Sequence, residues 1–137
     1  MRTTATATTR TFIAALIVLA LGAFVSACSP SGPATPAEGS AEREAIFAAM
    51  RQGREIPDQV FVARDFKVQD GWAWVTADPQ SKDGTQHYEA ESWLLQKTGD
   101  TWAVAAQPCA EESCEPKDEV AKIRARFPAA PEAIFPK

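Results

Sequence analysis

The first hydrophobic pattern after the N-terminal segment has the period of a helix. Ile46, Ala49 and Met50 recur at intervals of three and four residues, which places them on one side of a helix. Ser40 is a residue type preferred at the N-cap, and Gly53 is a residue type that ends helices. The sequence therefore predicts an amphipathic helix between Ser40 and Gly53.

An alternating pattern follows and predicts a strand over residues 59–68, interrupted only by Arg64. The apolar residues expected on one face of this strand are Val60, Val62, Phe66 and Val68. Asp70 and Gly71 come next and favour a tight hairpin turn, because both adopt left-handed conformations at low cost. We expect residues 72–77 to form the returning strand.

Two further strands complete the predicted sheet. Residues 78–86 are polar and contain Pro, Asp and Gly, so they indicate a loop. Residues 87–97 and 101–107 have strand character and are joined by the turn-forming residues 98–100. Four consecutive strands with short connections favour an antiparallel meander, and the N-terminal helix is expected to cover one of its faces.

The C-terminal part predicts a second, short helix. Pro116 stands at a favoured first helical position, apolar residues repeat at three and four up to Phe127, and Pro128 ends the pattern. We assign no regular structure to the tail, in which Ile134 and Phe135 are candidates to pack back onto the domain. The predicted fold class is α+β: an N-terminal helix on a four-stranded antiparallel meander, with a short C-terminal helix after a disulfide loop.

The N-terminal segment has the features of a signal peptide. Arg2 and Arg10 precede residues 11–27, which carry no charge. This apolar run is shorter than the roughly 20 residues needed to cross a bilayer. It ends at Val25-Ser26-Ala27-Cys28, which resembles the lipobox of bacterial lipoproteins. The alternative is an ordinary secretory signal cut near Ala27, with Cys28 left as a free thiol.

The lipobox resemblance implies removal of residues 1–27 and acylation of Cys28, so that fatty acyl chains hold the protein on a membrane. In that family an aspartate directly after the acylated cysteine favours retention in the inner membrane. This position is Ser29 here, so the resemblance implies the outer membrane, with the domain in the periplasm. Residues 29–40 are rich in Pro, Gly and Ser and predict a flexible tether with a reach of roughly 37 Å. The chain thus divides into a signal peptide (1–27), an acylated cysteine with its tether (28–40) and one domain (41–137).

Charge limits the classes of partner. The chain has 14 Lys+Arg and 18 Asp+Glu, a net charge of −4. Removing residues 1–27 takes away two arginines and leaves 12 basic against 18 acidic residues, a net charge of −6. This balance argues against a nucleic-acid-binding protein and against additional docking on anionic lipids.

Cys109 and Cys114 remain once Cys28 is acylated, and in an oxidising compartment they are expected to form a disulfide. A redox pair is the first alternative, but the acidic residues between the two cysteines would raise a thiol pKa. A zinc site is the second, and it would have to recruit His87 from far away in the sequence. We therefore predict no metal and no cofactor.

The remaining candidates for catalysis are few. His87 is the sole imidazole, so any Ser-His or Cys-His arrangement must use it. Glu89 and Glu91 are two residues apart on a predicted strand and share a face, where they could act as a carboxylate pair. The alternative is a solvated face balanced by nearby cations. The candidate cations are Lys67, Arg64 and Lys97. We expect no enzymatic activity.

Trp72 and Trp74 fall on one face of a strand whose other face, with Ala73 and Val75, is also apolar. Both faces must therefore be covered by other elements or by a partner. The tryptophans are either core residues or part of an exposed partner-binding patch. The candidate patch residues are Trp72, Trp74, Tyr88 and Trp102.

Two segments carry a further resemblance. Residues 70–75 (DGWAWV) and 94–104 (LLQKTGDTWAV) are similar to parts of small secreted envelope domains of Gram-negative bacteria. The second segment also resembles the closing hairpin of cystatin-like and nuclear-transport-factor-like sheets. These resemblances imply an α+β fold and transfer no catalytic residue.

Together these features favour a lipid-anchored, non-catalytic binding module with a protein partner in the periplasm. One form of this hypothesis is an inhibitor or immunity protein against a cell-wall-active enzyme. The alternative is a structural accessory subunit of an envelope assembly such as a secretion system.

Overall fold

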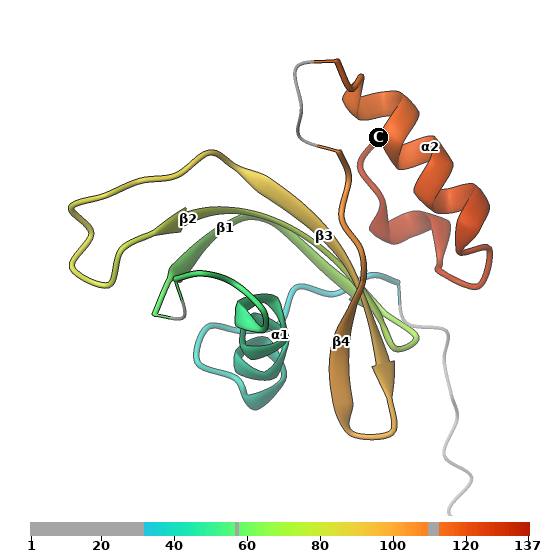
Figure 1. Ribbon diagram of the computed structural model, residues 1–137. Coiled ribbons are helices and arrows are strands. Elements are labelled where there is room, and N and C mark those ends of the chain that lie inside the picture. Colours follow the sequence, from blue (N-terminus) through green and yellow to red (C-terminus); the bar gives the residue numbers. More distant parts are fainter. Residues whose placement is uncertain (1–31, 57, 110–112) are drawn as a thin grey trace, which may run out of the picture.

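The computed structural model describes residues 32–56, 58–109 and 113–137, so the signal segment and the lipobox lie outside it. The described part forms two α-helices, four strands and one short 3-10 helix. In chain order they are α1 (Ala41–Arg51), β1 (Val60–Gln69), β2 (Trp72–Gln80), β3 (Glu91–Thr98), β4 (Thr101–Ala106), α2 (Pro116–Arg126) and η1 (Glu132–Ile134). The sheet order is β1-β2-β3-β4 with every neighbouring pair antiparallel, which confirms the predicted meander (Figure 1).

Helix α1 begins and ends at the residues that the sequence indicates. Ser40 is the N-cap, and its Oγ accepts a hydrogen bond of 3.3 Å from the backbone N–H of Arg43. At the other end Gly53 has φ +75°, a conformation that glycine adopts without strain. The turn between β1 and β2 uses the same freedom, because Asp70 and Gly71 have φ values of 51° and 77°.

A bulge in β1 changes which of its residues face the core. The register between β1 and β2 shifts at Arg64, and one inserted residue reverses the alternation of the strand. As a result Phe61 and Phe66 both lie in the core beneath α1, whereas Val62 is 47% exposed. The prediction that Val62 shares a face with Phe66 is therefore wrong, because simple alternation does not anticipate the bulge.

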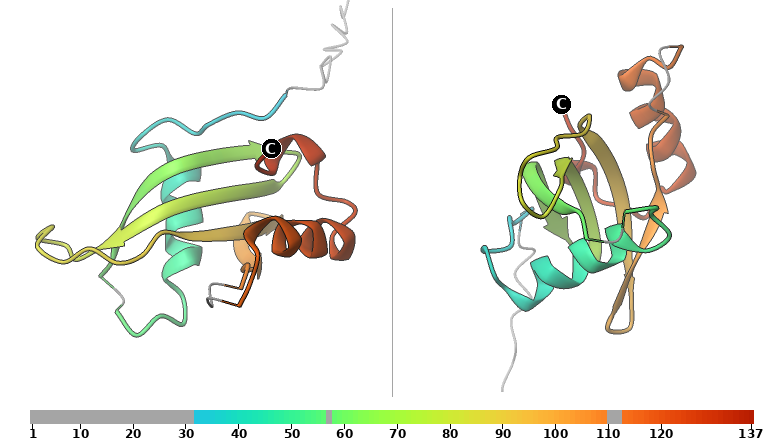
Figure 2. Two further views of the ribbon diagram at one scale, coloured as in Figure 1. Left: turned by 90° about the horizontal axis from the view of Figure 1, so that it is seen from above. Right: turned by 60° about the vertical axis from the view of Figure 1, so that its left-hand side comes forward.

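The two faces of the sheet are covered by different parts of the chain (Figure 2). On one face α1 packs on side chains from all four strands. The larger members of this core are Ile46, Phe47, Met50, Phe61, Phe66, Val75, Trp93, Leu95 and Trp102. The other face is covered by α2 and the C-terminal tail. The larger members of this second core are Trp72, Trp74, Leu94, Ile123, Ile134 and Phe135.

All four tryptophans are core residues. Trp72 is 6% exposed, Trp74 1% and Trp102 3%, and Trp93 is equally buried at 2%. The ring of Phe135 lies 5.3 Å from that of Trp74, so the tail does pack back onto the sheet. Of the four candidate patch residues only Tyr88 is partly exposed. The patch alternative is therefore wrong for the three tryptophans, because α1, α2 and the tail cover them.

Residues 32–37, here called the N-terminal strap, lie along the outer edge of β1 (Figure 2). The Ala34 N–H donates to the Val68 carbonyl at 2.9 Å, and the Val68 N–H donates to the Ala34 carbonyl at 2.8 Å. The Thr35 hydroxyl donates to the Phe66 carbonyl at 2.7 Å. A strand edge offers unpaired backbone groups, which explains why part of the predicted tether is held on the domain.

Candidate functional site

Cys109 and Cys114 form a disulfide, as predicted, with a Cα–Cα distance of 5.9 Å. The bond connects the chain that leaves β4 to the start of α2. Residues 110–112 of the enclosed loop lie outside the described residues. The disulfide therefore closes a short loop in the connection between the sheet and α2.

The candidate catalytic residues do not form a common cluster. His87 is exposed and forms an isolated bridge with Gln80, and within the described residues no hydrogen bond joins its ring to another side chain. Glu89 is also exposed, whereas Glu91 forms an ion pair with Arg54. Two of the three expected cations pair with aspartates instead, and the Lys97 ammonium lies over the Trp102 ring. Lys67 contacts Asp65, and Arg64 contacts Asp78.

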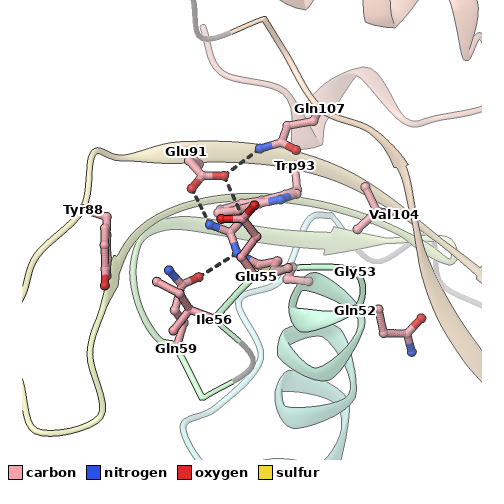
Figure 3. Close-up of a pocket in the computed structure, with 12 residues that line it drawn as sticks. Gln52, Gly53, Glu55, Ile56, Gln59, Tyr88, Glu91, Trp93, Val104 and Gln107 are labelled. Carbon is pink, nitrogen blue, oxygen red and sulfur yellow. Dashed lines mark hydrogen bonds and ion pairs between the residues drawn. The ribbon is translucent and has the colours of Figure 1, made fainter.

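An open hollow of about 590 Å³ lies at the end of α1 (Figure 3). It lies between the segment that follows α1 and the sheet strands β3 and β4. Its lining comes from Met50, Gln52, Gly53, Arg54, Glu55, Ile56, Gln59, Tyr88, Glu91, Trp93, Val104 and Gln107. Of these residues, the sequence analysis names only Tyr88 and Glu91 as candidates for a functional site.

An ion-paired network crosses this pocket. Arg54 donates from Nη2 to Glu91 Oε1 at 2.6 Å and from Nη1 to Glu91 Oε2 at 2.9 Å, a bidentate geometry. Its Nε donates to Gln59 Oε1 at 2.6 Å, and Gln107 Nε2 donates to Glu91 Oε2 at 2.7 Å. The dashed lines in Figure 3 mark these contacts.

Burial and aromatic contacts hold the network in place. The side chains of Arg54 and Glu91 are 21% and 20% exposed. The Arg54 guanidinium lies over the rings of Trp93 and Phe61, at 5.7 and 5.8 Å from their centres. Such stacking favours a fixed orientation of the planar guanidinium group.

Electrostatics keep both members of the pair charged. The hydrogen bond from Arg54 lowers the pKa of Glu91 below its ordinary value, although burial acts in the opposite direction. The same bond raises the pKa of Arg54. A carboxylate with a lowered pKa stays ionised at neutral pH, so Glu91 cannot serve there as a proton donor. The pair is suited to holding a shape and presenting polar groups.

Apolar side chains surround these charges at the mouth of the pocket. Ile56 is 39% exposed and Val104 is 42% exposed, and both are large hydrophobic residues. Tyr88 is partly exposed on the side of the pocket opposite Val104, in the segment that enters β3 (Figure 3). The pocket therefore combines a rigid polar floor with an accessible apolar rim.

Sequence reasoning missed Arg54, Gln59 and Gln107. Arg54 directly follows the glycine that ends α1, and its partner Glu91 lies 37 residues further along the chain. The one available signal was an acidic residue, Glu91, next to apolar positions inside the strand predicted over residues 87–97. That signal marks a buried carboxylate and does not identify its partner.

Comparison with protein-family models, with curated proteins and with solved structures found no match to this chain. Among the described residues there is no group of three or more His, Cys, Asp or Glu side chains that could hold a metal ion. In the same ranges no helix is both long and apolar enough to cross a bilayer. The function is therefore inferred from the residues and geometry of the chain itself.

Proposed function

We propose that this chain is a lipid-anchored binding module of the bacterial cell envelope, and that it contacts a protein partner through the pocket at the end of α1. The anchoring half of this proposal is supported by the lipobox resemblance at residues 25–28. The Cys109–Cys114 disulfide agrees with an oxidising compartment outside the cytoplasm.

The observation that carries the binding half is the composition of the pocket. Ile56 and Val104 expose apolar surface beside the largely buried, bidentate ion pair of Arg54 and Glu91. Protein interfaces combine exposed apolar anchors with oriented hydrogen-bonding groups in the same way. The fixed Arg54–Glu91 pair gives the surface a defined shape before a partner arrives, which reduces the entropy lost on binding.

Charge favours a basic partner. The protein carries a net charge of −6 after removal of residues 1–27, and exposed Glu55 lies at the mouth of the pocket. Glu89 lines an adjacent pocket that shares Glu91 and Gln107 with the first. An acidic surface steers a basic protein to this end of the domain. An inhibitor of a basic cell-wall-active enzyme is the form of the proposal that these charges support.

Anchoring is tested by replacing the acylated residue. Cys28→Ala is expected to move the protein from the membrane fraction to the soluble fraction. Mass spectrometry of the wild type should find a diacylglyceryl group at Cys28. A wild-type protein with an unmodified N-terminus at another residue, recovered in the soluble periplasmic extract, would contradict this half of the proposal.

Binding is tested with a matched pair of valines. Val104→Arg places a charge on the pocket rim, and Val62→Arg makes the same change at a comparably exposed valine of β1. Mild crosslinking is expected to yield a one-to-one complex with a basic protein that only the first variant loses. No complex above background would contradict binding, and migration with a megadalton assembly on a native gel would favour the accessory-subunit alternative.

A further inference from the structure

We propose that the N-terminal strap fixes the orientation of the domain on the membrane. In this arrangement the end of the sheet that carries the Asp70-Gly71 turn faces the lipid surface, and the pocket end points away from it. The inference rests on acylation of Cys28, as proposed above. It concerns a different surface from the pocket and a different partner, the lipid surface itself.

The strap is bound to β1 over several residues. Beyond the paired backbone groups of Ala34 and Val68 and the Thr35 hydrogen bond, Arg43 Nη1 donates to the Pro36 carbonyl at 3.1 Å. The contact with Arg43 connects the strap to α1 as well as to β1. These bonds hold the segment that leads back towards the acylated residue.

The direction of the strap decides where the chain leaves the domain. Ala34 and Val68 form an antiparallel bridge, so the chain runs back from Ala34 towards the end of β1. Gly32 consequently lies at the β1–β2 turn, where it lines a small pocket together with Asp70 and Gly71. Figure 1 shows the described chain starting at this end of the sheet.

The chain outside the described structure is too short to let the domain move far. Four Cα steps separate Cys28 from Gly32, and a fully extended chain spans at most about 14 Å over that length. A tether that was free up to residue 40 would reach roughly 37 Å. Docking of the strap therefore shortens the free connection by more than half.

The pocket lies at the opposite end of the same strands. Gln59 directly precedes β1, Glu91 begins β3 and Gln107 follows β4. The two hairpin turns lie together at the other end, where the Lys97 N–H donates to the Gly71 carbonyl at 2.8 Å. Because β1 has ten residues, about 30 Å of strand separates the two ends.

Charge does not explain a membrane contact of the turn end. Asp70 and Asp100 lie in its two turns, Glu42 lies beside the strap, and Lys97 is the cation next to Gly71. Binding to anionic lipids needs clusters of basic residues. The covalent link and the docked strap must therefore set the orientation, which should be the same on zwitterionic and anionic vesicles.

A matched pair of labelled variants tests this orientation. Lys97→Cys lies at the turn end and Lys82→Cys in the loop at the pocket end, and both replaced residues are exposed lysines. Each acylated variant is labelled with the same fluorophore and placed on phosphatidylcholine vesicles that contain a nitroxide-headgroup lipid. We expect several-fold stronger quenching at position 97. Equal quenching, or stronger quenching at position 82, would overturn the orientation.

Undocking the strap gives an independent test. The double substitution Ala34→Pro and Thr35→Val removes two hydrogen-bond donors to β1, and Gly32→Pro is the control because its N–H makes no hydrogen bond to described residues. In the double variant, quenching at position 97 should exceed quenching at position 82 by much less than in the parent protein. In the control variant the difference in quenching should be unchanged. An unchanged difference in the double variant would contradict the role of the strap.

These outcomes separate the orientation from the anchor. Vesicle co-sedimentation and the mass of the N-terminal peptide report on acylation of Cys28 before any quenching is measured. A protein without the acyl group would overturn the anchoring half of the proposed function together with the orientation. An acylated, vesicle-bound protein with equal quenching at both labels would overturn only the orientation.

Discussion

The two ends of the sheet are held together by different kinds of interaction. At the turn end, backbone geometry dominates: Asp70 and Gly71 adopt positive φ values, and the strap pairs with β1 through main-chain hydrogen bonds. At the pocket end, side chains dominate through the Arg54–Glu91 pair and its aromatic supports. Backbone hydrogen bonds do not titrate, whereas the Arg54–Glu91 ion pair does. Acid should therefore weaken the interactions at the pocket end and leave those at the turn end unchanged.

The largest effect is expected from Trp93→Ala. This ring is 2% exposed and supports both Phe61 and Arg54, so its loss should lower the free energy of unfolding by about 3–5 kcal/mol. It should also remove the acid sensitivity that Glu91 contributes. Denaturant unfolding at neutral and acid pH measures both effects.

Trp72→Ala is the matched control, because Trp72 is 6% exposed and lies on β2 next to the turn. It should also destabilise the protein but leave the acid sensitivity intact. An equal change in acid sensitivity in the two variants would contradict the claim that the acid-sensitive interactions lie at the pocket end.

Arg54→Met should produce the next largest effect. It leaves the partly buried Glu91 carboxylate without its main partner, at a cost of about 1–3 kcal/mol. The lowered folded pKa of Glu91 means that the ion pair stabilises the protein above the ordinary glutamate value of 4.5, and that this contribution disappears as the pH falls through the folded pKa. The variant should therefore lose less stability on acidification than the wild type.

A double-mutant cycle with Glu91→Gln isolates the coupling between the two side chains. If the effects of Arg54→Met and Glu91→Gln simply added, the pair would not be the interaction that holds the pocket end.

Gly71→Ala should have a smaller effect. The residue has φ +77°, which costs a residue with a Cβ about 1 kcal/mol, although the added atom itself would meet only Lys97 at 3.8 Å. This loss should be independent of pH. Thermal or denaturant unfolding measures it, and Gly32→Ala, where a Cβ meets nothing within 4 Å, should leave stability unchanged. A pH-dependent loss in Gly71→Ala would contradict the assignment of this end to backbone geometry.

The smallest effect concerns the exposed loop between β2 and β3. The Ser81 hydroxyl and the Thr85 N–H and hydroxyl donate to Asp83, and they lower the pKa of Asp83 to about 2. An NMR titration should find a midpoint near that value, and Ser81→Ala should raise it. Because its folded pKa is lowered, this carboxylate stabilises the protein above the ordinary aspartate pKa and loses that contribution as the pH falls towards 2. Ser81→Ala should therefore lower stability slightly at neutral pH, and it should lose less stability on acidification than the wild type. An ordinary aspartate midpoint in the wild type would show that these hydrogen bonds do not form in solution.

The sequence was most informative where local chemistry decides the structure. Ser40, the Asp70-Gly71 pair and Pro116 each act within a few residues, and each stands where it was expected. The meander followed because its strands and turns are consecutive. The disulfide could also be predicted, because two nearby cysteines remain after the lipobox cysteine is set aside.

Features that depend on distant parts of the chain could not be predicted in this way. The bulge at Arg64 reflects how β1 fits β2, and docking of the strap at Val68 depends on an open strand edge. The partner of Glu91 comes from the end of α1, 37 residues away. From charge and alternation alone, the expected partners of Glu91 were cations on the strands, namely Lys67, Arg64 and Lys97.

The most direct test of a binding module that faces away from its anchor is site-specific photo-crosslinking in intact cells. The same photoreactive residue is introduced at Val104, on the pocket rim, and at Val62, a comparably exposed valine on β1. We predict one discrete crosslinked protein from position 104 in the membrane fraction and none from position 62. Equal crosslinking from both positions, or crosslinking from position 62 alone, would contradict the account.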